Sequence, residues 1–183
     1  MKLEPLTQSQ CEQVRLWRNA EMECWRTPFM LTEDMQYDFY ERCSDRNSPH
    51  RYFAIMGNGY KFIGMGGITY IQWENRIGEI TLIIDPQVRK DGLGEQAVDL
   101  LLDQAFNHLN LNAVFGECYC CNPAFEFWKR YVDVYASGAA TTTWVYLPVR
   151  KYWNGQYWSS LYFNVCKNDF NKNNNRIEPA CKS

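Results

Sequence analysis

Apolar side chains recur every third or fourth position over residues 93–109. The set comprises Leu93, Ala97, Val98, Leu101, Leu102, Ala105, Phe106 and Leu109. This spacing places them on one face of an α-helix, so the segment is predicted to be a long amphipathic helix that packs against a core. The polar residues Gln96, Asp99 and Asp103 fall between them and are expected to face solvent.

Three further segments have helix start signals. Thr7 and Gln10 form a capping box, which predicts a helix that begins directly after Thr7. Thr32 is expected to cap a second helix over residues 33–43. A short helix is predicted over residues 123–131, because its first residue is a proline, which suits the first helical turn.

Strand-like segments surround these helices. They cover residues 3–5, 52–56, 61–71, 78–84, 113–120, 141–147 and 157–167. Gly57-Asn58-Gly59 predicts a turn between the second and third segments, and Asn154-Gly155 predicts a type I′ hairpin between the last two. Hairpins around a strand–helix–strand unit predict an α/β (α+β) fold with a mixed sheet.

The 183-residue chain agrees in length with one domain. No repeat or linker interrupts residues 1–167, which are therefore expected to form a single domain. From Asn168 the composition turns to asparagine and lysine, and residues 168–183 are predicted to be a polar C-terminal tail.

Composition excludes several classes of protein. Hydrophobic residues at 46% and charged residues at 22% exclude an intrinsically disordered chain. A net charge of −2 argues against a nucleic-acid partner, which would require a basic surface. The start of the chain lacks a secretory signal, and no apolar run is long enough to span a bilayer. We therefore expect a cytoplasmic protein with no membrane partner.

The eight cysteines and two histidines suggest neither a disulfide framework nor a zinc site. Small buried hydrophobes in a reducing compartment are the favoured interpretation. A metal or redox site is the alternative.

Residues 85–97 join the carboxyl end of a predicted strand to the start of the long helix. Free backbone N–H groups and the helix dipole converge at such a junction. Gly92 and Gly94 allow the backbone to approach a phosphate, and Arg89 and Lys90 add positive charge. The segment therefore predicts a diphosphate-binding turn, the alternative being a glycine-rich turn that only packs.

Three phosphate-binding motifs compete for this turn. A Walker A motif is absent. The sequence from Gly92 to Ala97 matches the dinucleotide pattern G-x-G-x-x-A, but about seven residues separate it from the strand, and two hairpin-like strands precede it. The pattern R-x-x-G-x-G, from Arg89 to Gly94, fits its surroundings better.

That pattern follows a strand, leads into a long helix, and is followed by a strand and Asn122. In this order it resembles the GNAT superfamily of acyl-CoA-dependent N-acetyltransferases, over about residues 3–167. Trp17-Arg18-Asn19 and residues 64–68, Gly-Met-Gly-Gly-Ile, look like the branch that acetylates ribosomal-protein alanine N-termini and amino sugars. The resemblance implies a mixed, mostly antiparallel central sheet of about seven strands flanked by about four helices.

The resemblance also implies acetyl-CoA as co-substrate and no metal. It implies that one strand pairs with pantetheine and that the turn after it binds the pyrophosphate. The strand residues are Leu82, Ile83 and Ile84, and the turn residues are Arg89, Lys90, Asp91, Gly92, Leu93, Gly94 and Glu95. Asn122 matches a family asparagine that contacts the pantetheine arm, and Trp128 lies near the position of a family tyrosine at the sulfur.

Glu79 matches a strand glutamate that serves as general base in some family members. The alternative is a strand carboxylate that pairs with a cation. Tyr131 is the candidate general acid, with Tyr119 and Tyr157 as further candidates and a structural role as the alternative for each. The aromatic residues Trp25, Phe29, Tyr152, Trp153 and Trp158 either wall an acceptor pocket or pack the hairpin and loops.

These observations predict an N-acetyltransferase in which a primary amine attacks acetyl-CoA directly in a ternary complex. No cysteine or serine lies in a recognisable nucleophile setting. The alternative is a GNAT-like module that binds CoA or acts as an inactive structural or regulatory partner. It stays open because residues 122–131 are one residue shorter than the family pattern. The acceptor is a small-molecule amine, an amino sugar or a protein N-terminus, and a homodimer is compatible with the sequence.

Overall fold

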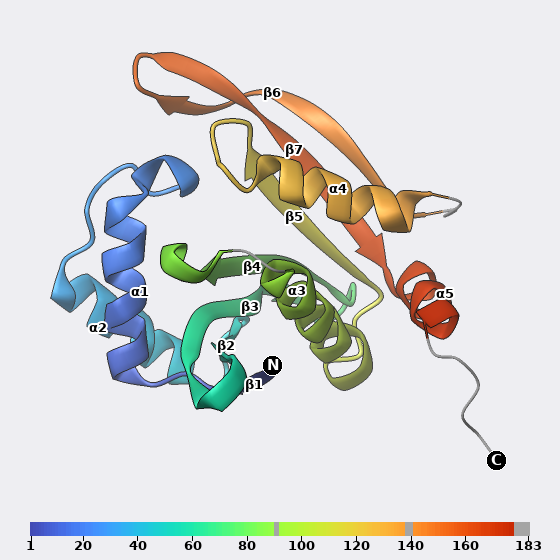
Figure 1. Cartoon of the computed structure of the whole chain (residues 1–183), viewed down its shortest axis with the longest axis horizontal. Coiled ribbons are helices and arrows are strands. Elements are labelled where there is room, and N and C mark those ends of the chain that lie inside the picture. Colours follow the sequence, from blue (N-terminus) through green and yellow to red (C-terminus); the bar gives the residue numbers. More distant parts are fainter. Residues whose placement is uncertain (90–91, 138–140, 178–183) are drawn as a thin grey trace.

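Seven strands form one sheet in the order β1-β2-β3-β4-β5-β7-β6 (Figure 1). The computed structural model describes residues 1–89, 92–137 and 141–177. The strands are β1 (Lys2–Pro5), β2 (Arg51–Met56), β3 (Phe62–Gln72), β4 (Ile77–Ile84), β5 (Ala113–Tyr119), β6 (Thr143–Trp153) and β7 (Gln156–Cys166). Within these described ranges, β4 and β5 are the only strands that pair in parallel. The predicted mixed, mostly antiparallel sheet of seven strands is therefore confirmed.

The described part of the chain contains five α-helices, one more than predicted. They are α1 (Gln8–Ala20), α2 (Glu33–Ser44), α3 (Leu93–Asp103), α4 (Phe125–Ala136) and α5 (Lys167–Ile177). No helix within those described residues is long and apolar enough to cross a membrane.

The sheet opens between β4 and β5. These strands pair only from Ile77 to Glu79 and from Ala113 to Phe115. Beyond that point β4 continues beside β3 alone and β5 continues beside β7 alone, so the two strands diverge (Figure 1). The divergence leaves an unpaired strand edge in the middle of the sheet.

Helices cover the two faces of the sheet differently. On one face, Val14 and Trp17 of α1 pack against Met65 and Ile83. On the other face, α3 packs on β3 and β4, and α4 runs along β5, β7 and β6 (Figure 1). Because side chains alternate along a strand, Ile83 faces α1, whereas its neighbour Leu82 packs in the core on the α3 side.

The predicted caps of α1 and α2 and the predicted Asn154-Gly155 turn are confirmed. Thr7 and Gln10 form the reciprocal capping box at α1, and the Thr32 side chain accepts a hydrogen bond from the Met35 amide. Asn154 and Gly155 have φ of 50° and 79°, which matches the two positive values that a type I′ turn requires. These signals act within a few residues, so they do not depend on the rest of the fold.

Two helices differ in length from the prediction. α4 begins at Phe125, two residues after the proline predicted as its first residue, because Ala124 is its N-cap. It continues beyond residue 131 to Ala136, because Val132 and Tyr135 extend its buried face. The helix predicted over residues 93–109 is α-helical only to Asp103 and continues as a π-helical turn over Gln104–His108.

The polar tail predicted from Asn168 is instead the helix α5 through Ile177. Its Phe170 is buried against Phe106 and Tyr135. The buried carboxylate of Asp169 accepts hydrogen bonds from Thr141 and Thr142. Phe170 and Asp169 therefore anchor the helix within a mostly polar segment, which explains why its composition did not predict it.

Candidate functional site

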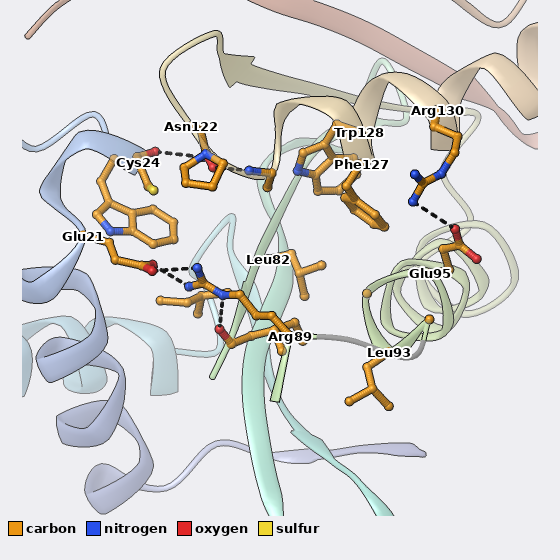
Figure 2. Close-up of a pocket in the computed structure, with 17 residues that line it drawn as sticks. Glu21, Cys24, Leu82, Arg89, Leu93, Glu95, Asn122, Phe127, Trp128 and Arg130 are labelled. Carbon is orange, nitrogen blue, oxygen red and sulfur yellow. Dashed lines mark hydrogen bonds and ion pairs between the residues drawn. The ribbon is translucent and has the colours of Figure 1, made fainter. Parts of the chain in front are cut away.

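A cavity of about 500 Å³ lies where the loop after α1, the end of β4, the start of α3 and α4 meet (Figure 2). Its lining comprises Glu21, Cys24, Trp25, Leu82, Ile83, Ile84, Arg89, Gly92, Leu93, Gly94, Glu95, Asn122, Pro123, Ala124, Phe127, Trp128 and Arg130. All the described residues predicted to bind the cofactor are in this set. Lys90 and Asp91, also predicted to bind it, lie outside the described residues.

One wall of the cavity is the diverging end of β4. Leu82, Ile83 and Ile84 line it, beyond the last pair that β4 makes with β5. An unpaired strand edge presents backbone N–H and C=O groups that can hydrogen-bond an extended ligand like an added strand. The geometry therefore suits an amide-containing arm laid along β4.

A second wall is the start of α3. Gly92 has φ of 73° and provides no side-chain cap, and the first backbone bond of the helix runs from Gln96 N–H to Gly92 C=O at 3.2 Å. The amides of Leu93, Gly94 and Glu95 therefore have no acceptor within the helix. Free amides at a helix start, together with the helix dipole, suit an anion such as a diphosphate.

The two glycines of the turn have different roles. A Cβ at Gly92 would meet nothing within 4 Å, so glycine is favoured there by its left-handed φ. A Cβ at Gly94 would lie 3.1 Å from the ring of Phe127, so this glycine lets α3 approach α4 closely. Packing, the alternative interpretation of the turn, therefore accounts for Gly94.

Arg89, predicted to be a free cation for phosphate, is paired. Its terminal nitrogens donate to both carboxylate oxygens of Glu21 at 2.7 and 2.5 Å, and its Nε donates to the Ile84 carbonyl at 3.0 Å (Figure 2). The pair ties the loop after α1 to the end of β4. It also places a carboxylate in the cavity wall.

The sequence analysis missed Arg130, which lines the cavity from α4. Its guanidinium lies 3.8 Å from Glu95 at the start of α3, and its side chain is 68% exposed (Figure 2). It is therefore the more accessible of the two cavity arginines. It lies one helical turn after the cavity residue Phe127 and therefore on the same helix face, but the sequence analysis had not placed Phe127 at the site.

Asn122 and Trp128 contribute two side chains to the cavity lining. The Asn122 side chain donates to the Cys24 carbonyl at 3.4 Å and accepts from the Ala124 amide at 2.8 Å, so it joins the β5–α4 turn to the loop after α1 (Figure 2). Trp128 stacks on Phe163, with ring centroids 5.1 Å apart. Both residues line the cavity, and the shorter segment after β5 leads into a regular helix.

Cys24 is the thiol that lines the cavity in the described structure. Burial raises the pKa of this thiol to about 12. Cys24 is therefore protonated at neutral pH, and a protonated thiol is a weak nucleophile. Among the described residues, no group of three or more histidine, cysteine or acidic side chains is arranged to hold a metal ion.

Glu79 lies near the cavity but not in its lining. It is buried where β4 and β5 diverge, and both its carboxylate oxygens accept hydrogen bonds from Arg26. These hydrogen bonds raise the pKa of Arg26 above its usual value. The structure thus shows the cation pairing that was the alternative role for Glu79.

Tyr131 is not among the cavity residues. It is buried between α3 and α4, where its hydroxyl donates to Asp99 at 2.5 Å. Burial, with Tyr135 and Asp99 adding to it, raises the pKa of Tyr131 far above its usual range. Tyr119 and Tyr157 are also absent from the lining. The candidate acid is thus placed in a structural contact, because α4 turns its hydroxyl toward α3.

The aromatic residues considered as an acceptor wall separate in the structure. Trp25 lines the cavity, whereas Phe29 and Tyr152 are exposed. Trp158 donates to the Trp153 carbonyl across the β6–β7 hairpin. Only Trp25 is therefore placed at the cavity.

Comparison with known families gives one match. The model described as "Acetyltransferase (GNAT) domain" matches residues 1–126, which is more than half of the chain. No curated protein matches the chain significantly.

Solved structures with the same fold include spermidine acetyltransferases of Vibrio cholerae. A mutant form of the spermidine/spermine N-acetyltransferase SpeG has a TM-score of 0.78 at 18% identity, covering 97% of this chain and 98% of that chain. The V. cholerae spermidine N-acetyltransferase in complex with CoA and spermine has a TM-score of 0.76 at 18% identity, covering 92% and 96%. At this identity the likeness shows a shared fold.

Proposed function

The chain belongs to the GNAT acetyltransferase family, and we propose that it transfers the acetyl group of acetyl-CoA directly to a primary amine, with both substrates bound at once. It is thus an acetyl-CoA-dependent N-acetyltransferase. One observation supports the binding mode most strongly. The uncapped start of α3 and the unpaired edge of β4 open on the same cavity.

The residues present fit CoA. The free amides of Leu93, Gly94 and Glu95 are placed to hold the diphosphate, and Arg130 can add a charged contact. The edge of β4 at residues 82–84 is placed to pair with the amides of the pantetheine arm. The Asn122 side chain contributes a further polar contact to the arm.

The chemistry requires a neutral amine and a thiolate leaving group. Each Glu79 oxygen accepts one bond from Arg26 and keeps a further lone pair, so Glu79 can accept the amine proton through a water. A thiol with a pKa of about 8.5 leaves readily as the thiolate, so a dedicated general acid is dispensable. This agrees with a lining that contains no tyrosine among the described residues.

Direct transfer is favoured over an acetylated enzyme. A covalent route would need a thiolate or an activated hydroxyl at the cavity. Cys24 is held as the neutral thiol, and no serine or threonine belongs to the described lining. The amine is therefore proposed to attack the thioester itself.

The acceptor is proposed to be a small-molecule amine that enters where β4 and β5 diverge. The solved relatives are named for spermidine and spermine, which are small amines. A reducing cytoplasm is the proposed compartment, because the seven cysteines among the described residues are all unpaired. A homodimer remains a prediction.

Release of free thiol from acetyl-CoA, followed for a panel of primary amines, tests this function. We expect amine-dependent release with formation of the N-acetylated product by mass spectrometry. CoA binding without release for any amine would instead support the alternative of a CoA-binding module.

A further inference from the structure

Two glutamates and an arginine meet where β4 and β5 diverge. Glu79 pairs in parallel register with Phe115, and Glu117 follows Phe115 by two positions on β5. Since paired residues and alternate residues share a face of a sheet, both carboxylates lie on the face that carries Ile83. This is the face opposite α3 and α4.

Arg26, in the loop after α1, bridges the two strands. It donates to both oxygens of Glu79, at 2.5 and 3.1 Å, and to Glu117 Oε2 at 3.4 Å. On the other side of Glu117, Oε1 accepts from Arg150 Nε at 2.9 Å and from Ser160 at 2.7 Å. Two guanidiniums and two carboxylates thus form one network.

The carboxylate side chains and the arginine side chains of this network differ in their exposure to solvent. The side chains of Glu79 and Glu117 are only 11% and 6% exposed, whereas those of Arg26 and Arg150 are 51% and 46% exposed. A guanidinium has five N–H donors, and Arg150 uses only Nε in this network. The solvent side therefore presents free donors and positive charge, with the acceptor oxygens beneath them.

Glu117 stays charged within this network. Burial alone raises the pKa of Glu117, but hydrogen bonds from Arg150 and Ser160, with the charges of Arg150 and Arg26, lower it overall. Its negative charge is therefore engaged by the two arginines. A second ammonium group that arrives from solvent would meet only carboxylates that are already paired with guanidiniums in this network.

Lys151 holds Arg26 in position. Its buried ammonium donates to the carbonyls of Met22, Glu23 and Trp25, at 3.2, 2.6 and 2.5 Å. Trp25, the residue before Arg26, lines the cavity, so Arg26 lies next to the cavity wall.

An apolar surface lies beside Glu117. The stacked rings of Phe115 and Tyr162, with centroids 5.9 Å apart, form this half-buried floor. The two arginines therefore border a preformed site.

We propose that the acceptor amine carries an anionic group, a carboxylate or a phosphate, which binds Arg150 and Arg26. This inference rests on the proposed acetyl transfer and names its substrate class. Guanidinium forks match carboxylate and phosphate oxygens in geometry, and such charge-assisted bonds are strong. The methylene chain of the acceptor lies on Phe115 and Tyr162, and its amine points toward the place where β4 and β5 diverge. A polyamine is disfavoured, because its second ammonium would face the two guanidiniums.

Three acceptors of matched length test the proposal. Each has a primary amine at one end of five methylenes. The far end is a second primary amine, present as an ammonium, in 1,5-diaminopentane, a carboxylate in 6-aminohexanoate and a phosphate in 5-aminopentyl phosphate. Thiol release from acetyl-CoA gives kcat and KM for each. Arg150→Gln is the main variant, because Arg26→Gln would also alter Glu79. Arg42→Gln, which removes an exposed arginine of α2 outside the network, is the matched control.

We expect the wild type to prefer at least one anionic acceptor, and the two anionic arms distinguish a carboxylate from a phosphate. Arg150→Gln should raise KM for that acceptor about 10-fold, as loss of a charged hydrogen bond implies, and should leave KM for the diamine the same or lower, because one of the two guanidiniums that its second ammonium faces is gone. Arg150→Lys should restore part of the affinity, and Arg42→Gln should leave KM unchanged for all three acceptors. A wild-type preference for the diamine, or an equal effect of Arg150→Gln on all three, would overturn the proposal.

A second readout separates this inference from the proposed reaction. If no acceptor releases thiol, the proposed transfer fails, and calorimetric titration of the CoA-bound protein with the same three compounds decides the acceptor class. Tighter binding of an anionic compound that weakens in Arg150→Gln would support the anion site. Tighter binding of the diamine, or no difference among the three, would overturn it.

Discussion

Arg26 donates to both carboxylate oxygens of Glu79, at 2.5 and 3.1 Å. The two residues are 53 positions apart in the chain, and their contact joins the loop after α1 to the point where β4 and β5 diverge. The candidate base is therefore positioned by a residue of the loop that also lines the cavity. Catalysis and acceptor binding are expected to share this contact.

Glu79→Gln tests the base. Glutamine keeps the shape of the side chain but cannot take up the amine proton, so kcat should fall about 100-fold, with the Kd for CoA nearly unchanged. Glu74→Gln, at an exposed position in the β3–β4 turn, is the control and should retain the wild-type rate. An unchanged kcat in Glu79→Gln would leave Glu79 as a structural partner of Arg26.

Tyr131→Phe tests whether a tyrosine serves as the acid. The substitution removes the hydrogen bond to Asp99, so the free energy of unfolding should fall by about 1 kcal/mol. The hydroxyl lies outside the cavity lining, so kcat should stay within about twofold of wild type. Loss of a true general acid would lower kcat much more, by about 100-fold or greater. Denaturant unfolding and thiol release measure the two quantities. A large loss of kcat in a Tyr131→Phe variant that is fully folded would show that Tyr131 takes part in the reaction.

Direct transfer predicts that the enzyme is never acetylated. Cys24 has its pKa raised to about 12 by burial, so it should not form a thioester at neutral pH. Intact-protein mass spectrometry after incubation with acetyl-CoA, without acceptor, should show the unmodified mass. Stoichiometric addition of one acetyl group that an amine then removes would establish a covalent route instead.

Asp169 predicts a pH dependence of stability. Burial raises the pKa of Asp169, but the hydrogen bonds from Thr141 and Thr142 outweigh it and lower the pKa below its usual value. A depressed folded pKa stabilises the protein above the unfolded pKa of about 3.9, and this stability is lost as the pH falls through the folded pKa. Asp169→Asn should therefore be less stable than wild type at pH ~7.

The stability difference between wild type and Asp169→Asn should narrow as the pH falls below about 4, because Asp169 of the unfolded chain is protonated first and the folded carboxylate only at its lower pKa. Denaturant unfolding across this range measures it. A difference that does not change with pH would show that Asp169 contributes through its shape alone.

The sequence predicted features that depend on neighbouring residues. The capping box of Thr7 and Gln10, the Asn154-Gly155 turn and the glycine turn before α3 all appear in the structure. Each is set by interactions within a few positions. The residues that the family resemblance predicts to bind CoA, where the structure describes them, all line one cavity.

Contacts between distant residues were not predictable in this way. Arg89 meets Glu21 across 68 positions, and the direction in which α4 points Tyr131 depends on Asp99 of α3. α5 was missed because its anchors, Phe170 and Asp169, act only once Phe106 and Thr142 are packed beside them. The roles proposed for Glu79 and Tyr131 therefore depend on contacts that only the tertiary structure shows.

Calorimetric titration with CoA tests the binding mode most directly, through a pair of matched glycine variants. Gly92 and Gly59 both have a left-handed φ, 73° and 66°, and a Cβ at either would meet nothing within 4 Å. Tryptophan therefore introduces similar backbone strain at both, but only Gly92 lines the cavity.

We expect Gly92→Trp to weaken CoA binding at least 10-fold, because its side chain obstructs the approach of a diphosphate to the amides of α3. Gly59→Trp should bind CoA like the wild type. Equal affinity in the two variants would contradict the assignment of the α3 turn as the CoA diphosphate site, and with it the proposed function of the cavity.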